Sequence, residues 1–369
     1  MSNNPLFDVT APAPHAIGTG LIALDVIVKR GSKPSGRWTG GTCGNVMSIL
    51  SYLGWGSYPV ARLNGDDASK QVLADFERWG TRLQFAETEP GAETPIVIHK
   101  IRQNAAGQPV HGFSLNCPYC GAFLPTYRAV LASAAEKVAS KIKNPKVFFF
   151  DRVSRGALIL AKDCADKGAL IVFEPSGIGE PNLFLEALGI THILKYSSER
   201  VDGFKELISA ARPLLEIETV GKEGLRYRGS KISGRAKAWH KVEAHVAAAV
   251  KDTAGAGDWC TAGLIHRLAQ GGLAGFEQIG NDSLSQALSF GQAMAAWTCG
   301  FEGARGGVYQ RSKKTFQTEV AAILDKSKSQ LSETESQPLV SEQQQHSRHN
   351  AKRSSGAVRT RSPRAACCF

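Results

Sequence analysis

Residues 252–258 read Asp-Thr-Ala-Gly-Ala-Gly-Asp, and Trp-Cys-Thr-Ala-Gly-Leu-Ile follows at 259–265. Apolar residues continue at helical spacing up to Gln270, so a glycine-rich turn leads into a helix. Small residues let a ligand approach the backbone closely, and the unpaired N–H groups at a helix start favour an anion such as a phosphate. A carboxylate at Asp258, beside that anion, can accept a proton from an attacking hydroxyl group. The stretch therefore predicts a site for phosphoryl transfer.

Two other glycine-containing segments imitate nucleotide-binding loops. Gly18-Thr-Gly20 runs on into strand-like sequence, whereas a dinucleotide fingerprint opens a helix. The segment 31–36 is followed by Arg37 and Trp38 rather than by Lys and a Ser or Thr, so it is no Walker A loop. A plain loop that only opens a helix is the alternative for residues 252–258, but there two carboxylates bracket a run of small side chains.

Strand and helix patterns alternate along most of the chain. Strand patterns cover residues 16–28 (with a polar break at Asp25), 58–62, 147–150, 170–174, 192–195 and 217–220. Helix patterns cover about 41–54, 68–79, 128–142, 155–167 and 258–270. Because strands that alternate with helices pair in parallel, the sequence predicts an α/β domain whose sheet is covered by helices.

Residues 94–124 interrupt this alternation. A strand pattern at 94–101, a turn at 104–107 and a returning strand at 110–115 predict a β-hairpin, which precedes the loop Cys117-Pro-Tyr-Cys120. The cysteine pair has the spacing of half a zinc site. Completing that site would need ligands such as His99, His111 or Cys43, and two free thiols in a turn are the alternative.

The stretch 252–265 resembles the C-terminal signature of the PfkB family of ribokinase-like carbohydrate kinases, and the resemblance extends over most of residues 16–310. It implies a three-layer α/β/α fold with a mostly parallel central sheet and a small β lid. It also implies that Asp258 is the catalytic base and that the amides of Gly255, Ala256 and Gly257 form the anion hole. Asp252 lies where family members contact a monovalent cation, which implies potassium.

The N-terminal half carries the residues that hold the substrate in this family. Asp25 lies where members hold sugar hydroxyls, and Gly40-Gly41-Thr-Cys-Gly-Asn45 resembles the Gly-Gly…Asn element. Cys43 and Met47 depart from the usual small residues, and the spacing from Gly54 to Gly65 is one residue longer than in the family pattern.

ATP and Mg²⁺ are the expected cofactors. The loop Thr219-Val-Gly221-Lys-Glu-Gly224 resembles the family's element near the nucleotide phosphates, together with Asp252 and Thr253, and residues 287–306 resemble its adenine wall. The segment Lys195-Tyr-Ser-Ser-Glu199 lies where many members have an Asn-x-x-Glu element that organises Mg²⁺. The asparagine is absent, so Glu199 is the candidate for this role.

Composition predicts a cytoplasmic protein. The chain has 369 residues, of which 43% are hydrophobic, without an apolar run long enough for a membrane span and without a secretory signal. We expect a flexible leader at 1–15, a kinase domain at 16–325 and a disordered basic tail at 326–369. Residues 346–369 hold six basic and no acidic residues, so subtracting them from the net charge of +11 leaves +5 for residues 1–345, which argues against nucleic acid as a partner except through the tail.

These observations together predict an ATP-dependent phosphotransferase that acts on a hydroxyl group of a sugar or sugar-like molecule. The sequence does not give the oligomeric state, but lids in the family it resembles often pair into dimers, so the resemblance is compatible with a homodimer. A nucleoside kinase of the same fold is one alternative. A catalytically silent member that serves as a binding or regulatory subunit is the other.

Overall fold

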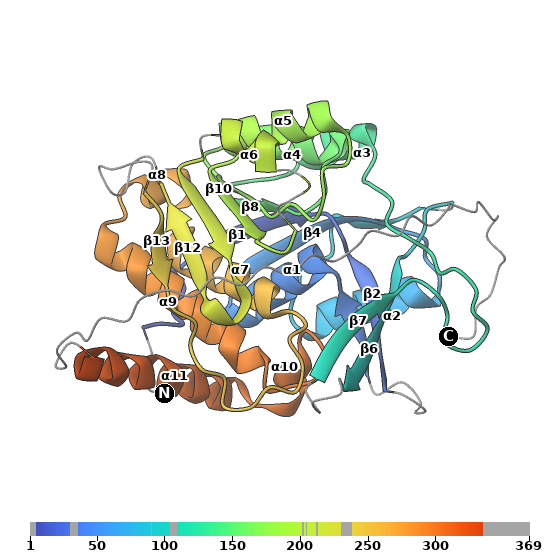
Figure 1. The fold of residues 1–369 in the computed structure, drawn as a ribbon. Helices are drawn as coiled ribbons and strands as arrows, with labels where there is room; N and C mark the ends of the chain where they lie inside the picture. Colours follow the sequence, from blue (N-terminus) through green and yellow to red (C-terminus); the bar gives the residue numbers. More distant parts are fainter. Residues whose placement is uncertain are drawn as a thin grey trace.

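The computed structural model describes residues 5–29, 36–89, 91–103, 109–200, 203, 205–211, 213–229 and 238–334. A nine-stranded sheet lies between two layers of helices (Figure 1). Its strand order is β13-β12-β11-β10-β9-β8-β1-β4-β5, and all neighbouring strands from β11 to β5 are parallel. The strands are β1 (His15–Thr19), β4 (Gly56–Leu63), β5 (Ala86–Thr88), β8 (Pro145–Phe150), β9 (Leu170–Phe173), β10 (Ile193–Ser197), β11 (Leu215–Thr219), β12 (Leu225–Arg228) and β13 (His240–Val242). The predicted three-layer α/β/α architecture is confirmed.

Alternate residues of the central strands supply two separate cores. In β8, Val147 and Phe149 belong to one hydrophobic cluster, whereas Phe148 and Phe150 belong to the other. The first cluster is covered by α1 (Thr42–Leu53), α7 (Ala256–Leu268), α8 (Gly272–Glu277), α9 (Asn281–Thr298) and α11 (Lys313–Thr334). The second is covered by α3 (Ala132–Ala139), α4 (Arg155–Asp166), α5 (Pro181–Ile190) and α6 (Lys205–Ala210). Each fully buried Phe contributes about 1.5–3 kcal/mol of transfer free energy.

A second sheet forms the lid at one side of the domain (Figure 1). Its order is β3 (Gly36–Gly40), β2 (Ala23–Lys29), β6 (Ile96–Gln103) and β7 (Pro109–Ser114), and the predicted hairpin is the antiparallel pair β6–β7. Helix α2 (Asp67–Arg78) packs against β2 and β3 on one face of this sheet. The other face carries Trp38 and Ile27, which contact the chain at Gly303.

The prediction of one strand over residues 16–28 is wrong. The chain leaves the main sheet after Thr19 and enters the lid sheet at Ala23. Gly20 makes this change of direction with φ 140°, and a Cβ there would lie 1.8 Å from Asp151 Oδ1. Strand β3 was not predicted, because its sequence, Gly-Arg-Trp-Thr-Gly, shows little alternation.

The two ends of the domain also differ from expectation. Residues 5–15 are not a loose leader, because the Phe7 ring is buried with its centroid 5.3 Å from those of Phe290 and Phe316, and His15 already belongs to β1. Helix α11 continues to Thr334, beyond the predicted domain boundary at 325. Residues 335–369, which hold most of the predicted basic tail, lie outside the described residues. No helix in the described ranges is long and apolar enough to span a membrane.

Candidate active site

Charged side chains gather where the parallel strands end. Asp151 and Glu174 follow β8 and β9 directly, Lys195 lies in the middle of the short strand β10, and Asp258 lies in the first turn of α7. Ligands of α/β proteins bind at this carboxyl edge of the strands. The arrangement therefore places the predicted motif at the edge of the sheet where a ligand is expected.

The glycine-rich loop has the backbone shape that its sequence predicted. Gly255 is the N-cap of α7 with φ 76°, and a Cβ there would lie 2.5 Å from Ala304 Cβ, so a larger residue does not fit. The first N–H groups of a helix have no partner inside the helix, and its dipole is positive at this end. The Ala256 N–H makes only a long turn bond of 3.3 Å to Thr253 O. The loop can therefore present N–H groups to an anion.

Asp258 is held by Asn45 from α1. The Asn45 Nδ2 group donates a hydrogen bond of 2.7 Å to Asp258 Oδ2, so a predicted substrate residue and the predicted base lie in contact although 213 positions separate them. Burial, and then the negative charge of Glu174, raises the pKa of Asp258 well above 3.8, whereas the Asn45 hydrogen bond and Lys195 lower it.

A buried ion pair supports the start of α7. Lys195 Nζ donates to Glu174 Oε1 at 2.7 Å and to Gly257 O at 3.3 Å. Thr261 Oγ1 donates to the other Glu174 oxygen at 2.5 Å. Burial lowers the pKa of Lys195, but Glu174 and the nearby Cys260 and Asp258 together outweigh this effect and raise the pKa, so Lys195 stays charged. Lys195 thereby ties the glycine-rich loop to β9 and β10.

Asp151 is a second buried carboxyl group at this edge. Its Oδ1 accepts a hydrogen bond of 2.9 Å from the Leu21 N–H, and its Oδ2 lies 2.6 Å from Arg152. Burial raises the pKa of Asp151 to about 6, although Arg152 and the Leu21 N–H lower it. The Arg152 side chain is 28% exposed. A charged pair thus lies beside the turn that connects the main sheet to the lid.

Asp25 reaches the site from the lid. Its Oδ2 lies 2.9 Å from His99 Nε2, and both side chains are buried. Burial lowers the pKa of His99, but the Asp25 carboxylate, with a smaller effect of Asp252, outweighs burial, so the pKa is raised. A Cβ at Gly40 would lie 1.8 Å from Asp25 Cγ, and Gly41 has φ 75° with Leu21 O close by. The glycine pair is therefore required for Asp25 to lie where it does.

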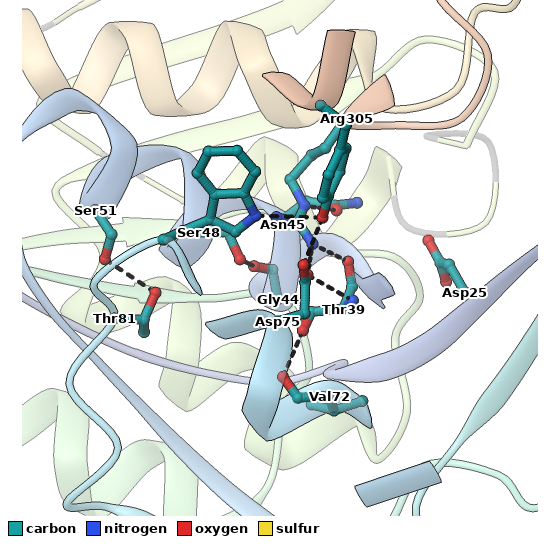
Figure 2. Close-up of polar contacts among 12 residues, drawn as sticks. Asp25, Thr39, Gly44, Asn45, Ser48, Ser51, Val72, Asp75, Thr81 and Arg305 are labelled. Atoms are coloured by element: carbon teal, nitrogen blue, oxygen red, sulfur yellow. Dashed lines mark hydrogen bonds and ion pairs between the residues drawn. The ribbon is translucent and has the colours of Figure 1, made fainter. Parts of the chain in front are cut away.

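Figure 2 shows a polar network behind Asn45, with Asp25 apart from it. Arg305 lies in the turn before α10 (Gly306–Gln310), and its Nε donates to Asn45 Oδ1 at 3.2 Å. Its Nη2 group contacts Asp75 Oδ2 at 2.5 Å and donates to Thr39 O. Arg305 is 1% exposed. This network joins the lid strand β3 and the helix α2 to the residue that holds Asp258.

The predicted nucleotide loops lie side by side with this site. Thr219 ends β11, the 3₁₀ turn η2 (Gly221–Glu223) follows, and Gly224 has φ 97° with Val242 O only 2.1 Å from where its Cβ would be. The Asp252 oxygens accept backbone bonds from Ala254 N at 3.0 Å and from Gly303 N at 2.8 Å. Asp252 thereby clamps the glycine-rich loop to the chain before Arg305.

The structure places the predicted Mg²⁺ residue, Glu199, and the predicted zinc half-site, Cys117 and Cys120, in different surroundings. Glu199 is exposed just beyond β10, at the carboxyl edge of the sheet where Thr219 ends the neighbouring parallel strand β11. A carboxylate at this edge suits Mg²⁺, which prefers oxygen ligands and retains several waters. Cys117 is buried and Cys120 is exposed. Within the described ranges no group of three or more His, Cys, Asp or Glu side chains forms a metal site, so the predicted zinc half-site stays incomplete there.

Sequence reasoning missed five residues of the site: Asp151, Glu174, Lys195, His99 and Arg305. The first three were detectable, because each is a charged residue at or just after the end of a predicted parallel strand. His99 was considered only as a zinc ligand. Arg305 gave no signal, since its partners Asn45 and Asp75 lie 260 and 230 positions away.

Comparison with known proteins agrees with this geometry. Residues 205–310 match the model of the pfkB family carbohydrate kinases. A ribokinase of Giardia lamblia superposes with a TM-score of 0.64 and 15% identity over 85% of this chain and 99% of that one. A double-mutant fructokinase of Vibrio cholerae O395 with fructose, ADP and potassium bound superposes with a TM-score of 0.60 and 16% identity, over 84% of this chain and 98% of that one. A nucleoside kinase of Burkholderia thailandensis in complex with inosine superposes with a TM-score of 0.59 and 17% identity, over 84% of this chain and 97% of that one.

No curated protein matches the chain in sequence. The solved structures are distant relatives in sequence and establish the ribokinase-like fold. The family match covers the segment that includes the glycine-rich loop, so the predicted resemblance to the pfkB family carbohydrate kinases is confirmed over residues 205–310.

Proposed function

We propose that the chain transfers the terminal phosphoryl group of ATP to a hydroxyl group of a sugar or sugar-like molecule. The observation that carries this proposal is the position of Asp258, a partly buried carboxyl group held by Asn45 in the first turn of α7. A hydroxyl group next to Asp258 can give up its proton to the carboxylate as it attacks the phosphorus. The N–H groups of Gly255, Ala256 and Gly257 would then stabilise the negative charge on the transferred phosphoryl group.

The two substrates would approach from opposite sides of this loop. Asp25, Gly40, Gly41 and Asn45 would hold the acceptor beneath the lid. Thr219, Gly221, Gly224, Asp252 and Thr253 would hold the nucleotide. Closure of the lid sheet over the acceptor would exclude water and so favour transfer over hydrolysis of ATP.

Both cations are part of the proposal. Mg²⁺ bound to the phosphates would offset their charge, with Glu199 as the residue of this chain that holds it through water. Each Asp252 oxygen accepts one backbone N–H, and an ionised carboxylate has lone pairs for further contacts, so Asp252 can also contact K⁺. The similar fructokinase of Vibrio cholerae O395 binds fructose, ADP and potassium together.

A nucleoside acceptor is the second candidate, and one observation favours it. The Phe113 ring of β7 is 62% exposed and packs edge-on against His99 with a centroid distance of 5.0 Å, on the face of the lid that carries Asp25. An aromatic ring there can stack on a nucleobase. A cytoplasmic location and pairing of two lids into a homodimer are further predictions.

A screen of acceptors tests this function. Purified protein is incubated with ATP, Mg²⁺ and K⁺ and with sugars, sugar acids or nucleosides, and ADP formation is measured. Phosphorylation of a sugar supports the proposal, and exclusive phosphorylation of nucleosides selects the second candidate. ATP binding without turnover on any acceptor would contradict both and would favour a regulatory binding role.

A further inference from the structure

The amide of Asn45 has a chemically different neighbour on each side. Its Nδ2 faces the carboxyl group of Asp258 at 2.7 Å, and its Oδ1 faces the Arg305 guanidinium at 3.2 Å. An ionised carboxylate only accepts hydrogen bonds, and a guanidinium only donates them. A flipped Asn45 would place its oxygen against the carboxylate and its NH₂ group against the guanidinium. Only one of the two amide orientations therefore satisfies both neighbours.

Arg305 is itself held rigidly. It forms an ion pair with Asp75 Oδ2 at 2.5 Å and donates to the Thr39 carbonyl. Asp75 in turn accepts bonds from the Thr39 N–H at 2.9 Å and from the Tyr309 hydroxyl at 2.6 Å. Burial raises the pKa of Asp75, but Arg305 and these hydrogen bonds outweigh it and lower the pKa, so the pair is ionised. The guanidinium thus has no freedom to turn away from Asn45.

From this geometry we infer that Arg305 is a positioning residue, which fixes the amide of Asn45 so that its NH₂ group always faces Asp258 and stabilises the ionised form of that carboxyl group. The inference rests on the proposed role of Asp258 as the base. It extends that role to a residue of the C-terminal loop that does not contact the reacting atoms.

Other charges also act on Asp258 and must be kept constant in the test. Glu174 after β9 and Asp151 after β8 disfavour the ionised form, and Lys195 of β10 favours it. The Cys43 thiol of α1 lies in the same environment, where burial raises its pKa. In the described part of the chain, Arg305 hydrogen-bonds to Asn45, Thr39 and Asp75 and to none of these groups, so substitution at 305 leaves them in place (Figure 2).

The test measures the protonation of Asp258 directly. The protein is labelled with aspartate carrying ¹³C in the side-chain carboxyl group, and the Asp258 signal is assigned by its loss in Asp258→Asn. In Arg305→Met, the titration midpoint of Asp258 is expected to rise by at least about one pH unit, a tenfold change in the proton equilibrium. Tyr309→Phe is the matched control, since it removes one partner of Asp75 but leaves the contact between Arg305 and Asn45.

A second variant guards against a failure to fold, because Arg305→Met leaves Asp75 buried without its cation. Arg305→Met combined with Asp75→Asn removes both charges and is expected to show the same shift. An unchanged midpoint in this double variant, with native near-UV circular dichroism, would overturn the inference, as would an equal shift in Tyr309→Phe. The titration midpoint of Asp258 is measured without turnover. A failed acceptor screen would therefore refute the proposed function, and the effect of Arg305 on the Asp258 midpoint could still be determined.

Discussion

The Asn45 Nδ2 group lies 2.7 Å from Asp258 Oδ2, which joins the substrate element of the N-terminal half to the first turn of the helix α7. Asn45 is 3% exposed, so its amide has little access to water, and loss of the bond leaves the partly buried Asp258 carboxyl group less well stabilised. The bond therefore couples the Gly-Gly…Asn element to the glycine-rich loop that opens α7.

The rate should depend on pH through Asp258. A base is active only when it is deprotonated, and because burial raises the pKa of Asp258, kcat/KM should fall as the pH drops, with a midpoint well above 3.8. Glu174→Gln removes the neighbouring charge that raises this pKa, so the midpoint should move to lower pH. Glu136→Gln, at the surface of α3, is the control and should leave the profile unchanged. A midpoint that rises in Glu174→Gln would contradict the assigned electrostatics.

Gly40→Ala should weaken acceptor binding. The new Cβ would lie 1.8 Å from Asp25 Cγ, so Asp25 must move. We expect the KM for the acceptor to rise at least about tenfold, which corresponds to about 1.4 kcal/mol, while the KM for ATP changes little. Gly275→Ala in α8, where a Cβ meets nothing within 4 Å, is the matched control. Equal effects on both KM values would place Asp25 outside the acceptor site.

Lys195→Met should destabilise the fold. Lys195 is nearly fully buried against Glu174, and the loss of one partner of a buried ion pair costs about 3–5 kcal/mol. Chemical denaturation would measure this change. Lys162→Met is the control, because Lys162 lies 2.6 Å from Glu186 but is 53% exposed, and such surface pairs contribute about 0–1 kcal/mol. An equal decrease in the free energy of unfolding in the two variants would show that burial of the Lys195 ion pair does not determine its contribution to stability.

His99 should contribute stability that depends on pH. Its pKa in the folded protein is raised by Asp25 above the unfolded value of about 6.5, so the contribution is complete below that value and is lost as the pH rises through the folded pKa. The difference in free energy of unfolding between wild type and His99→Gln should therefore be larger at pH 6 than at pH 9. A difference that grows with pH would mean that Asp25 does not stabilise the charged imidazole.

The fold was predictable because its signals are local. Strand patterns such as 147–150 and 170–174 and the hairpin at 94–115 depend on neighbouring residues, and the structure has strands at each of them. The division of 16–28 between two sheets was not predictable, since it depends on the contact of Gly20 with Asp151, 131 positions away in the sequence. Phe7 is similar, because its partners lie in α9 and α11.

The site was predictable where its chemistry is carried by one short motif. Residues 252–258 fold as a tight loop into α7, as their sequence predicted. The partners of that motif come from other elements: Asn45 and Lys195 contact it through side chains, and Arg305 acts on it only through Asn45. Arrangement in space determines these contacts, so sequence spacing alone could not identify them.

The most direct test of the account is the turnover of Asp258→Asn on an acceptor that the wild-type protein phosphorylates. The variant keeps the shape of the side chain and removes its ability to take a proton, so we expect kcat to fall about 10²–10⁴-fold while ATP binding and the unfolding transition stay near those of wild type. Turnover equal to that of wild type would contradict the assignment of Asp258 as the base.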